Sequence, residues 1–287
     1  MEANKLDRSV RSVSKQRLAE DLGHPNFNPQ NDLFIEELGG SIIGYAGVFL
    51  EPAIHRAILD CLIHPLHRRK GVATELIRHA IRRVREADCK VVQVYIPQIN
   101  LPARNLASRL DFKYIRRFYG LKLDPQKIRL PDVEPSGYVI RSLAADEASK
   151  LTHIQNRAFA DSWGFNPNTP AEIAYRINLS SCSPENIMMA YLNHQPIGYC
   201  WTRIMMEENP EADEIKGEIH MLGVDPDFRK KGIGRNILLA GLADLKKKGV
   251  TIVELTADGE EQVALGLYES VGFKVCSRAE WYEKTLV

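Results

Sequence analysis

Apolar residues recur every four positions in two stretches of the chain, each of which follows a turn rich in glycine and basic residues. The recurring positions are Val72, Leu76, Ala80 and Val84 in the first stretch, and Ile233, Ile237, Gly241 and Leu245 in the second. This spacing predicts two amphipathic helices, each with one face packed on a sheet. A β-rich segment follows each helix, KVVQVYI at 90–96 and TIVELTA at 251–257. Each region is therefore predicted to fold as strand, loop, helix and strand, with the two strands parallel and joined by a right-handed crossover.

The two regions read as copies of one another. When IHPLHRRKGVA (63–73) is aligned with VDPDFRKKGIG (224–234), a proline, an arginine, a lysine and a glycine match at one offset of 161 positions. Between the copies lies LDPQKIRLPDVEPSG (123–137), whose three prolines predict a non-helical connector. We therefore expect two domains, residues 1–129 and 130–287. The first copy has fewer residues before its loop, which predicts a shortened first domain.

The second half carries the patterns of further elements. Strands are predicted near 137–142, 186–192, 196–207 and 215–224, and helices near 145–159 and 170–177. A final helix and strand follow 251–257. Helices that alternate with β-rich segments in this way predict an α/β fold class.

Composition limits the class of protein. The chain has 287 residues and 44% hydrophobic positions, enough for two cores. Its 38 Lys and Arg against 37 Asp and Glu give a net charge of +1, which argues against a nucleic-acid or membrane partner. The five scattered cysteines predict reduced thiols and no metal site. With no leader-like start and no long apolar run, we expect a soluble cytoplasmic protein, monomeric or homodimeric.

The glycine-containing loop between a strand and a helix indicates an anion site. Such a turn directs several backbone N–H groups into one concavity, and the helix N-terminus adds partial positive charge. Gly232 and Gly234 let the backbone approach a phosphate, while Arg229, Lys230 and Lys231 supply charge at the rim. The alternative is an ordinary loop with solvated cations. The other basic runs, RHAIRRVRE and LKKKG, are predicted to be solvated helix faces and ends.

The stretch LGVDPDFRKKGIGRNIL resembles the acyl-CoA pyrophosphate loop of the GCN5-related N-acetyltransferase (GNAT) superfamily, whose pattern is Arg/Gln-x-x-Gly-x-Gly/Ala after a strand. LIHPLHRRKGVATELI is similar to the same pattern, and ALGLYESVGFKV (264–275) resembles the family's penultimate helix and last strand. The resemblance implies two tandem GNAT-like domains, each a mixed, mostly antiparallel sheet. In each sheet the central parallel pair splays apart to admit the pantetheine arm, and helices flank the sheet.

This resemblance also implies acetyl-CoA as the acyl donor and assigns the residues that hold it. In the second copy they are Leu222, Gly223, Val224, Arg229, Lys230, Lys231, Gly232, Ile233, Gly234 and Arg235. In the first copy they are Ile63, Arg68, Arg69, Lys70, Gly71, Val72 and Ala73. One departure from the family pattern is Glu261, which stands where an asparagine often begins the penultimate helix; the first copy retains Asn100.

Acetyl transfer from a thioester to an amine needs a proton acceptor for the amine and an acid for the departing thiolate. Glu218, six residues before Val224, is the candidate base, although it could instead be half of an ion pair with Lys216 or Arg203. Tyr268 matches the family's tyrosine acid, and its alternative role is to fill a core. Subtracting 161 leads to Ala57 and Ala107, so we expect the first domain to bind without catalysing.

The acceptor is expected to lie against FADSWGFNPNTP (159–170), where Asp161, Trp163 and Phe165 could form its wall. These aromatic residues could equally anchor the loop, and His220 is more simply a structural residue. The main hypothesis is direct, ternary-complex acetylation of a primary amine on a small molecule by the second domain. Acetylation of a protein N-terminus or lysine, and a non-catalytic acyl-CoA-binding regulatory module, are the alternatives.

Overall fold

The computed structural model describes residues 15–131, 137–205 and 214–286, which group into two compact units. Unit 1 contains the chain up to Phe118 together with Ser277–Val287, and unit 2 contains Tyr119–Cys276. The units therefore differ from the sequence repeats at two places. Residues 119–129 of the first repeat belong to unit 2, and residues 277–287 of the second repeat belong to unit 1.

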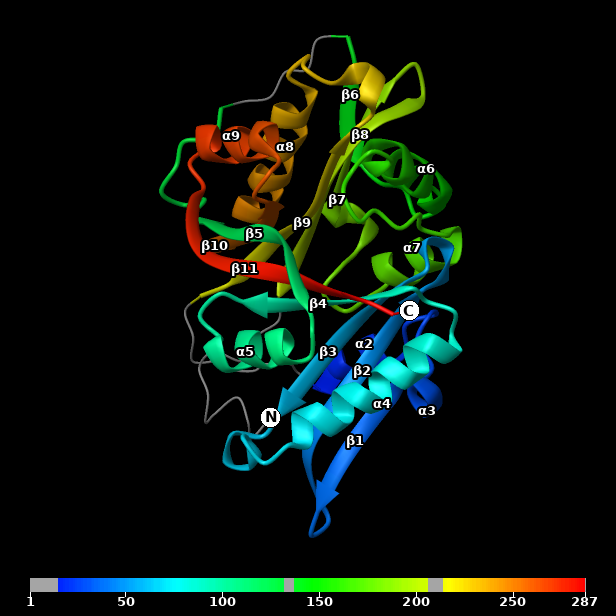
Figure 1. Ribbon diagram of the computed structural model, residues 1–287. Coiled ribbons are helices and arrows are strands. Elements are labelled where there is room, and N and C mark those ends of the chain that lie inside the picture. The colour runs from blue at the N-terminus through cyan, green and yellow to red at the C-terminus, as the bar shows by residue number, and fades with distance from the viewer. Residues whose placement is uncertain (1–14, 132–136, 206–213, 287) are drawn as a thin grey trace. The chain divides into compact units, whose positions relative to one another are not determined.

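Unit 1 contains a sheet with helices packed on it (Figure 1). Its helices are α2 (Lys15–Leu22), α3 (Pro29–Asp32), α4 (Val72–Glu86) and α5 (Leu101–Arg109). Its strands, in spatial order, are β1 (Leu33–Leu38), β2 (Ser41–Glu51), β3 (Arg56–Ile63), β4 (Val91–Pro97) and β11 (Lys274–Thr285). The pair β3–β4 is parallel and the other pairs are antiparallel. The predicted face of α4 forms the core of this unit, because Leu76, Ala80 and Val84 are buried.

Unit 2 repeats this plan with more elements. Its helices are α6 (Ala148–Phe159), α7 (Pro170–Ile177), α8 (Ile233–Lys247) and α9 (Gln262–Val271). Its strands, in spatial order, are the part of β5 (Lys113–Leu123) from Tyr119 onward, β10 (Ile252–Asp258), β9 (Lys216–Val224), β8 (Gln195–Met205), β7 (Ile187–Leu192) and β6 (Val139–Ser142). Strands β6 to β9 pair antiparallel, and β9–β10 is parallel. Residues 132–136 of the predicted connector, and the end of the strand predicted at 196–207, lie outside the described residues.

The sheet of unit 2 has a core on each face. On one face α8 and α9 cover Cys200, Ile219 and Val253, while on the other α6 and α7 cover Tyr199 and Trp201. Figure 1 shows α6 and α8 on opposite sides of β8. The prediction of a strand, loop, helix and strand in both halves, with a parallel pair in each, is confirmed.

The parallel strands of each unit stay together for only a few residues. In unit 2 the pairing of β9 with β10 runs from Lys216 to Glu218 and ends there, although β9 continues to Val224. In unit 1 the pairing of β3 with β4 ends at Leu59, four residues before the strand itself ends. Beyond these points the two parallel strands are no longer hydrogen-bonded to each other. Their backbone N–H and C=O groups are therefore available to another partner. The splayed central pair is thus present in both units.

A β-bulge interrupts β9 where the splay begins. Trp201 pairs with Met221 and the next residue of β8, Thr202, pairs with Ile219, so His220 is an extra residue. Strand β3 has no such insertion along its pairing with β2. Because a bulge disrupts the ladder locally, it accounts for the parallel pairing ending one pair earlier in unit 2 than in unit 1.

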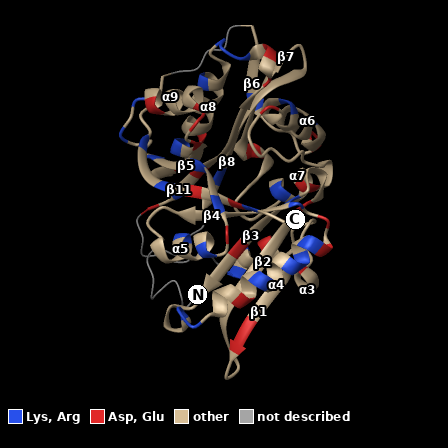
Figure 2. Ribbon diagram, viewed as in Figure 1, with Lys and Arg blue, Asp and Glu red and all other residues tan. Residues whose placement is uncertain are grey.

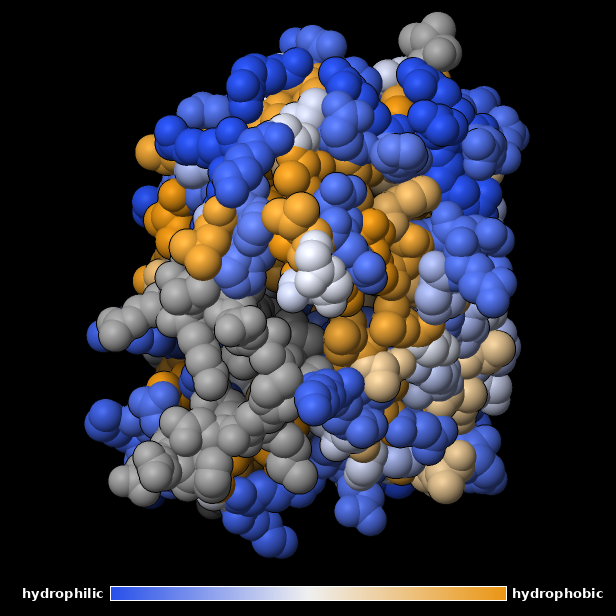
Figure 3. Space-filling view, turned by 90° about the horizontal axis from the view of Figure 1, so that it is seen from below, coloured by the Kyte–Doolittle hydropathy of each residue, from blue (hydrophilic) through white to orange (hydrophobic). Residues whose placement is uncertain are grey.

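Charged and apolar side chains both lie on the surface. The described lysines, arginines and acidic residues are spread over both units (Figure 2), in agreement with a net charge of +1. Exposed apolar residues include Ile35, Leu38 and Ile42 on β1 and β2, and the face seen in Figure 3 carries apolar side chains beside hydrophilic ones. No helix in the part of the chain that the structure describes has the length and apolar character needed to cross a membrane.

Candidate active site

The two predicted anion loops have the same backbone conformation. In unit 2 a short 3₁₀ turn at Pro226–Phe228 leads to Lys230 and Gly232, both with positive φ, at 60° and 78°. In unit 1 the equivalent residues Arg69 and Gly71 have φ of 61° and 87°. Helices α8 and α4 begin at the next residue after each glycine. The left-handed conformation explains the glycine, since a side chain there costs about 1 kcal/mol.

Each loop has a row of backbone N–H groups that donate no hydrogen bond within the described residues. Within the described residues, no hydrogen bond is donated by the amides of residues 230–235, and the helix ladder resumes with Asn236 donating to Gly232. The amides of residues 69–74 are likewise unpaired within the described chain, and the ladder resumes at Glu75. A Cβ placed on Gly232 or Gly71 would meet no atom within 4 Å. Six successive donors in front of open space suit the oxygens of a diphosphate.

The cations of the unit 2 loop divide into two groups. The exposed Arg229 makes two hydrogen bonds to backbone carbonyls: its Nε donates to Val224 at 3.2 Å and an Nη donates to Ala158 at 2.8 Å. Lys231 donates to the Asp227 carbonyl and lies 5.1 Å from the centre of the Phe228 ring. Lys230 is exposed at the rim. Arg229 therefore links the loop to β9 and α6 through these hydrogen bonds.

Asp225 and Arg157 form a pair that the sequence analysis missed. Asp225 is fully buried at the end of β9, and its carboxylate accepts from two nitrogens of Arg157 in α6, at 2.6 and 3.0 Å. The same carboxylate accepts from the amide of Asp227 and so caps the 3₁₀ turn. The Arg157 guanidinium holds the pKa of Asp225 below its usual range. In unit 1 His64 takes this place, with its ring nitrogen accepting from Leu66.

The predicted strand residues Leu222, Gly223 and Val224 lie on the splayed part of β9. Gly223 has a second reason to be glycine. A Cβ there would come within 3.0 Å of Tyr199, Ala158 and Phe159, so α6 packs directly on the backbone of β9. Gly234 at the start of α8 is next to Val224 and Leu267, which brings the loop, the splayed strand and α9 together.

Glu218 lies at the last pair of the parallel ladder. It is half-buried, stands opposite Arg203 of β8 and beside Glu254 of β10, and has no hydrogen bond or ion pair with any described residue. The ion-pair alternative with Lys216 or Arg203 is therefore not present. A Cβ on the neighbouring Gly217 would meet Val250 and Leu245 on the α8 face. Because successive side chains of a strand alternate between faces, Glu218 is directed to the face covered by α6 and α7.

Tyr268 belongs to the opposite face. It is 8% exposed in the core beneath α8 and α9, and its ring packs edge-to-face against Phe273 with centroids 5.9 Å apart. Burial raises the pKa of the phenol, with a smaller contribution from the Cys200 thiol. Cys200 pairs with Leu222 of β9, so this phenol is near the splayed segment. Glu218 and Tyr268 thus lie on opposite faces of the sheet, which corrects the expectation that base and acid face one side of it.

The segment expected to form the acceptor wall lies between α6 and α7. Phe165 stacks on Phe159 of α6 with ring centroids 6.4 Å apart, while Trp163 is half-buried and Asp161 is exposed. Two hydrogen bonds of 2.9 Å between Asn156 and the backbone of Asn168 fix the loop to α6. Phe165 therefore has the anchoring role that was the alternative, on the same face as Glu218.

The strand register changes which residue of unit 1 corresponds to the proposed base, Glu218. The 161-residue offset holds for α4 and α8 and for β4 and β10, but the bulge adds one residue to β9. The structural equivalent of Glu218 is therefore Ile58, which stands beside Gln93 as Glu218 stands beside Glu254. Ala107 remains the equivalent of Tyr268 and is buried in the core of unit 1. The two positions in unit 1 thus carry an isoleucine and an alanine, which cannot exchange a proton.

Comparison with known proteins identifies the class to which this fold and site belong. The model of the acetyltransferase (GNAT) family matches residues 4–112 and 149–273, which is more than half of the chain. The chain belongs to this family of acyl-CoA-dependent N-acetyltransferases, and its two matched segments make it a tandem member. The predicted resemblance and the fold class are confirmed.

Particular relatives are similar along most of the chain. Mycothiol acetyltransferase of Nocardia farcinica is 29% identical over 273 residues, covering 92% of this chain and 85% of that protein. The enzyme of the same name from Thermomonospora curvata is 31% identical over 237 residues, covering 82% and 76%. Among solved structures, a GCN5-related N-acetyltransferase from Sphaerobacter thermophilus has a TM-score of 0.75 at 20% identity, covering 99% and 89%. A tandem GNAT protein of the clavulanic acid biosynthesis pathway has a TM-score of 0.68 at 18% identity, covering 93% and 87%.

Proposed function

We propose that residues 130–287 catalyse transfer of an acetyl group from acetyl-CoA to a primary amine of a small molecule, by direct attack in a ternary complex. The observation that carries this proposal is the row of unpaired amides at residues 230–235 beside the splayed edge of β9. These amides would hold the diphosphate, and the backbone of residues 222–224 would pair with the pantetheine arm. The thioester would then lie in the opening between β9 and β10.

Two side chains would handle the protons. Glu218, on the acceptor face, takes the proton of the attacking ammonium directly or through a water molecule, so that a neutral amine forms the new amide bond. Tyr268, from the other face, donates its phenolic proton to the thiolate that departs, and the second proton that the nitrogen loses as the amide forms returns through water to the phenolate. A covalent acyl-enzyme is not needed, since Cys200 is fully buried and its pKa is raised to about 12.

Residues 1–129 are proposed to bind without catalysing. Their loop offers the same row of amides, yet Ile58 and Ala107 occupy the positions of the base and the acid. Calorimetric titration with CoA measures this directly. Two CoA per chain would support binding at both loops, and one CoA per chain would restrict the first loop to a structural role.

The decisive experiment compares Glu218→Gln with Glu254→Gln. Both are half-buried carboxylates at the same register position of neighbouring strands, so the pair controls for charge and location. We expect Glu218→Gln to lower kcat by about 100-fold or more and to change CoA affinity by less than about twofold. Unchanged turnover in Glu218→Gln would refute the assignment, and a loss confined to Glu254→Gln would transfer the role to Glu254. Tyr268→Phe should also lower kcat, and it tests the acid separately.

The acceptor is tested with a panel of amines. The relatives named mycothiol acetyltransferase place the amine precursor of mycothiol first in that panel. Acetylation of peptides with free N-termini or lysines, in preference to small amines, would favour the protein-acetylating alternative. CoA binding with no CoA release from acetyl-CoA by any amine would favour a regulatory binding module.

A further inference from the structure

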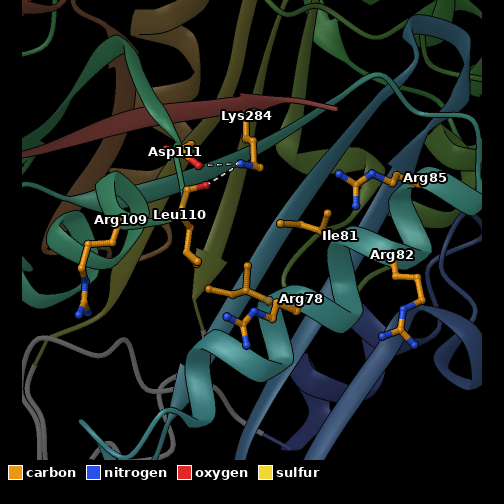
Figure 4. A pocket seen from close by; sticks show the side chains of 9 residues that line it. Arg78, Ile81, Arg82, Arg85, Arg109, Leu110, Asp111 and Lys284 are labelled. Carbon is orange, nitrogen blue, oxygen red and sulfur yellow. Dashed lines mark hydrogen bonds and ion pairs between the residues drawn. The ribbon is translucent and has the colours of Figure 1, made fainter. Parts of the chain in front are cut away.

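A basic depression lies on unit 1, away from the anion loop of that unit (Figure 4). Three arginines of α4 line it, Arg78, Arg82 and Arg85, together with Arg109 at the end of α5 and Lys284 of β11. These five cations come from three elements that are far apart in the sequence. The only acidic residue in the lining is Asp111, so its net charge is five minus one, or +4, in a chain whose whole net charge is +1.

Arg78, Arg82 and Arg85 are exposed, as expected of the solvated helix face that the sequence predicted for RHAIRRVRE. Positions 78, 82 and 85 are spaced by four and three residues, which places three like charges on one helix face and destabilises the helix slightly. Figure 2 shows several basic segments along α4. A favourable interaction of Arg85 with the end of the helix accounts for one of them. The same interaction accounts for Arg109 in the last turn of α5, and Lys284 of β11 is a further cation in the lining.

The charges in this depression are only partly neutralised. Arg78 pairs with Glu75 at 2.6 Å, and Lys284 donates to the Leu110 carbonyl at 2.8 Å and lies 3.6 Å from the Asp111 carboxylate. The side chains of Arg82, Arg85 and Arg109 have no hydrogen bond or ion pair with the described part of the chain. Three guanidinium groups, each able to bind two phosphate oxygens, therefore border one hollow without a partner.

The floor of the depression is apolar. Ile77 and Ile81 of α4 and Leu110 supply it, and the hollow has a volume of about 380 Å³, which is within the range of small-molecule sites. A purely inorganic anion would leave this floor uncovered. A ligand with a charged phosphate portion and a flat or apolar portion would contact both the arginines and the floor.

We propose that this depression binds an organic phosphate, a small molecule that carries a di- or triphosphate group and a ring. The arginines hold the phosphate groups, and the ring covers Ile77, Ile81 and Leu110. This inference is independent of the acetyl-transfer reaction, because none of these residues belongs to either loop. Extended nucleic acid is a different partner, and the small volume and the low overall charge argue against it.

The test is calorimetric titration of the full chain with ATP and with inorganic pyrophosphate, in the presence of saturating CoA. CoA occupies the amide loops, so any remaining binding reports a separate site. The test variants are Arg85→Glu and Arg109→Glu, since Arg82 also borders a second depression beside Phe34 and Glu86. The control is Arg129→Glu, which makes the same charge change at an exposed arginine in unit 2.

We expect ATP to bind wild type more tightly than pyrophosphate does, and to bind both test variants at least tenfold more weakly. Binding to Arg129→Glu should stay within about twofold, and CoA affinity should be unchanged in all three variants. Equal ATP binding by the test variants and the control, or abolition of all ATP binding by CoA, overturns the proposal. Binding of a DNA or RNA oligonucleotide without binding of ATP or pyrophosphate also overturns it, because the ligand would then be a polyanion.

Discussion

Gly232 and Gly71 occupy the same position of the two loops, so equal substitutions there separate the roles of the loops. Each has a positive φ and open space in front of it. Gly232→Ala should cost about 1 kcal/mol of stability and place a methyl group where the diphosphate is expected. We expect Gly232→Ala to raise KM for acetyl-CoA about tenfold, with little effect of Gly71→Ala on turnover. Equal loss of turnover in the two variants would contradict the assignment of catalysis to the second domain.

Glu147 is the most strongly hydrogen-bonded carboxylate described in unit 2, and it makes stability depend on pH. It accepts from Arg141 twice at 2.7 Å, from Lys150 at 2.7 Å and from Tyr191 at 2.9 Å. Arg141 is the main reason that the pKa of Glu147 lies well below its usual value. A depressed pKa in the folded state stabilises the protein above the unfolded pKa of about 4.3, and this stabilisation is lost as pH falls.

Glu147→Gln should therefore lower the free energy of unfolding at pH 7 by about 2 kcal/mol. The value is kept small because Arg141 and Lys150 are each 44% exposed, so solvent screens both interactions. Urea unfolding at pH 7 and pH 3 measures the difference between wild type and variant, which should shrink at the lower pH. A difference that stays constant between the two pH values would show that the stabilisation does not depend on the charge of Glu147. The control is Glu185→Gln, at an exposed glutamate.

At the scale of elements, the bulge at His220 is the main difference between β9 and β3. We expect deletion of His220 to restore a regular strand like β3, to let Ile219 pair with Leu255, and so to narrow the opening beside Glu218. Turnover should fall at least tenfold while CoA still binds. His220→Ala keeps the extra residue and should retain most activity. If the deletion leaves turnover unchanged, or if His220→Ala loses as much turnover as the deletion, the bulge is not required for catalysis.

The elements could be predicted from sequence because each has a local cause. The loop glycines mark a backbone turn, and the four-residue spacing after them marks the buried faces of α4 and α8. The bulge left no pattern, because a single additional residue in a half-buried strand changes neither composition nor spacing enough to be seen. The engagement of Arg229 with two carbonyls was also hidden, since Ala158 lies 71 residues away.

At the scale of the whole molecule, the end of each repeat belongs to the unit formed mainly by the other repeat. Leu121 and Leu123 of β5 are buried in the core of unit 2, and Tyr282 of β11 is buried in the core of unit 1. No local signal distinguishes this from two separate domains, because both final strands follow similar helices and only long-range pairing selects the partner. A cut at residue 130 would therefore remove core residues from both units.

This exchange predicts that two core residues nine positions apart stabilise different units. Tyr282 is 7% exposed and pairs with Val94 of β4. Its hydroxyl accepts a hydrogen bond from Arg104 and donates one to Glu280. Phe273, just before β11, is 2% exposed in the core of unit 2. Each truncation to alanine should cost about 3 kcal/mol or more.

Hydrogen exchange locates the loss. Tyr282→Ala should reduce protection of the amides of β4 and α4, because β11 is the strand that covers the edge of β4 in unit 1. Phe273→Ala should instead reduce protection of α8 and β10. Both variants have the same kind of cavity and the same sequence neighbourhood, so a difference in where protection falls must come from the path of the chain. If Tyr282→Ala left β4 protected and loosened α8 and β10, the last strand would belong with its own repeat, and the exchange would be excluded.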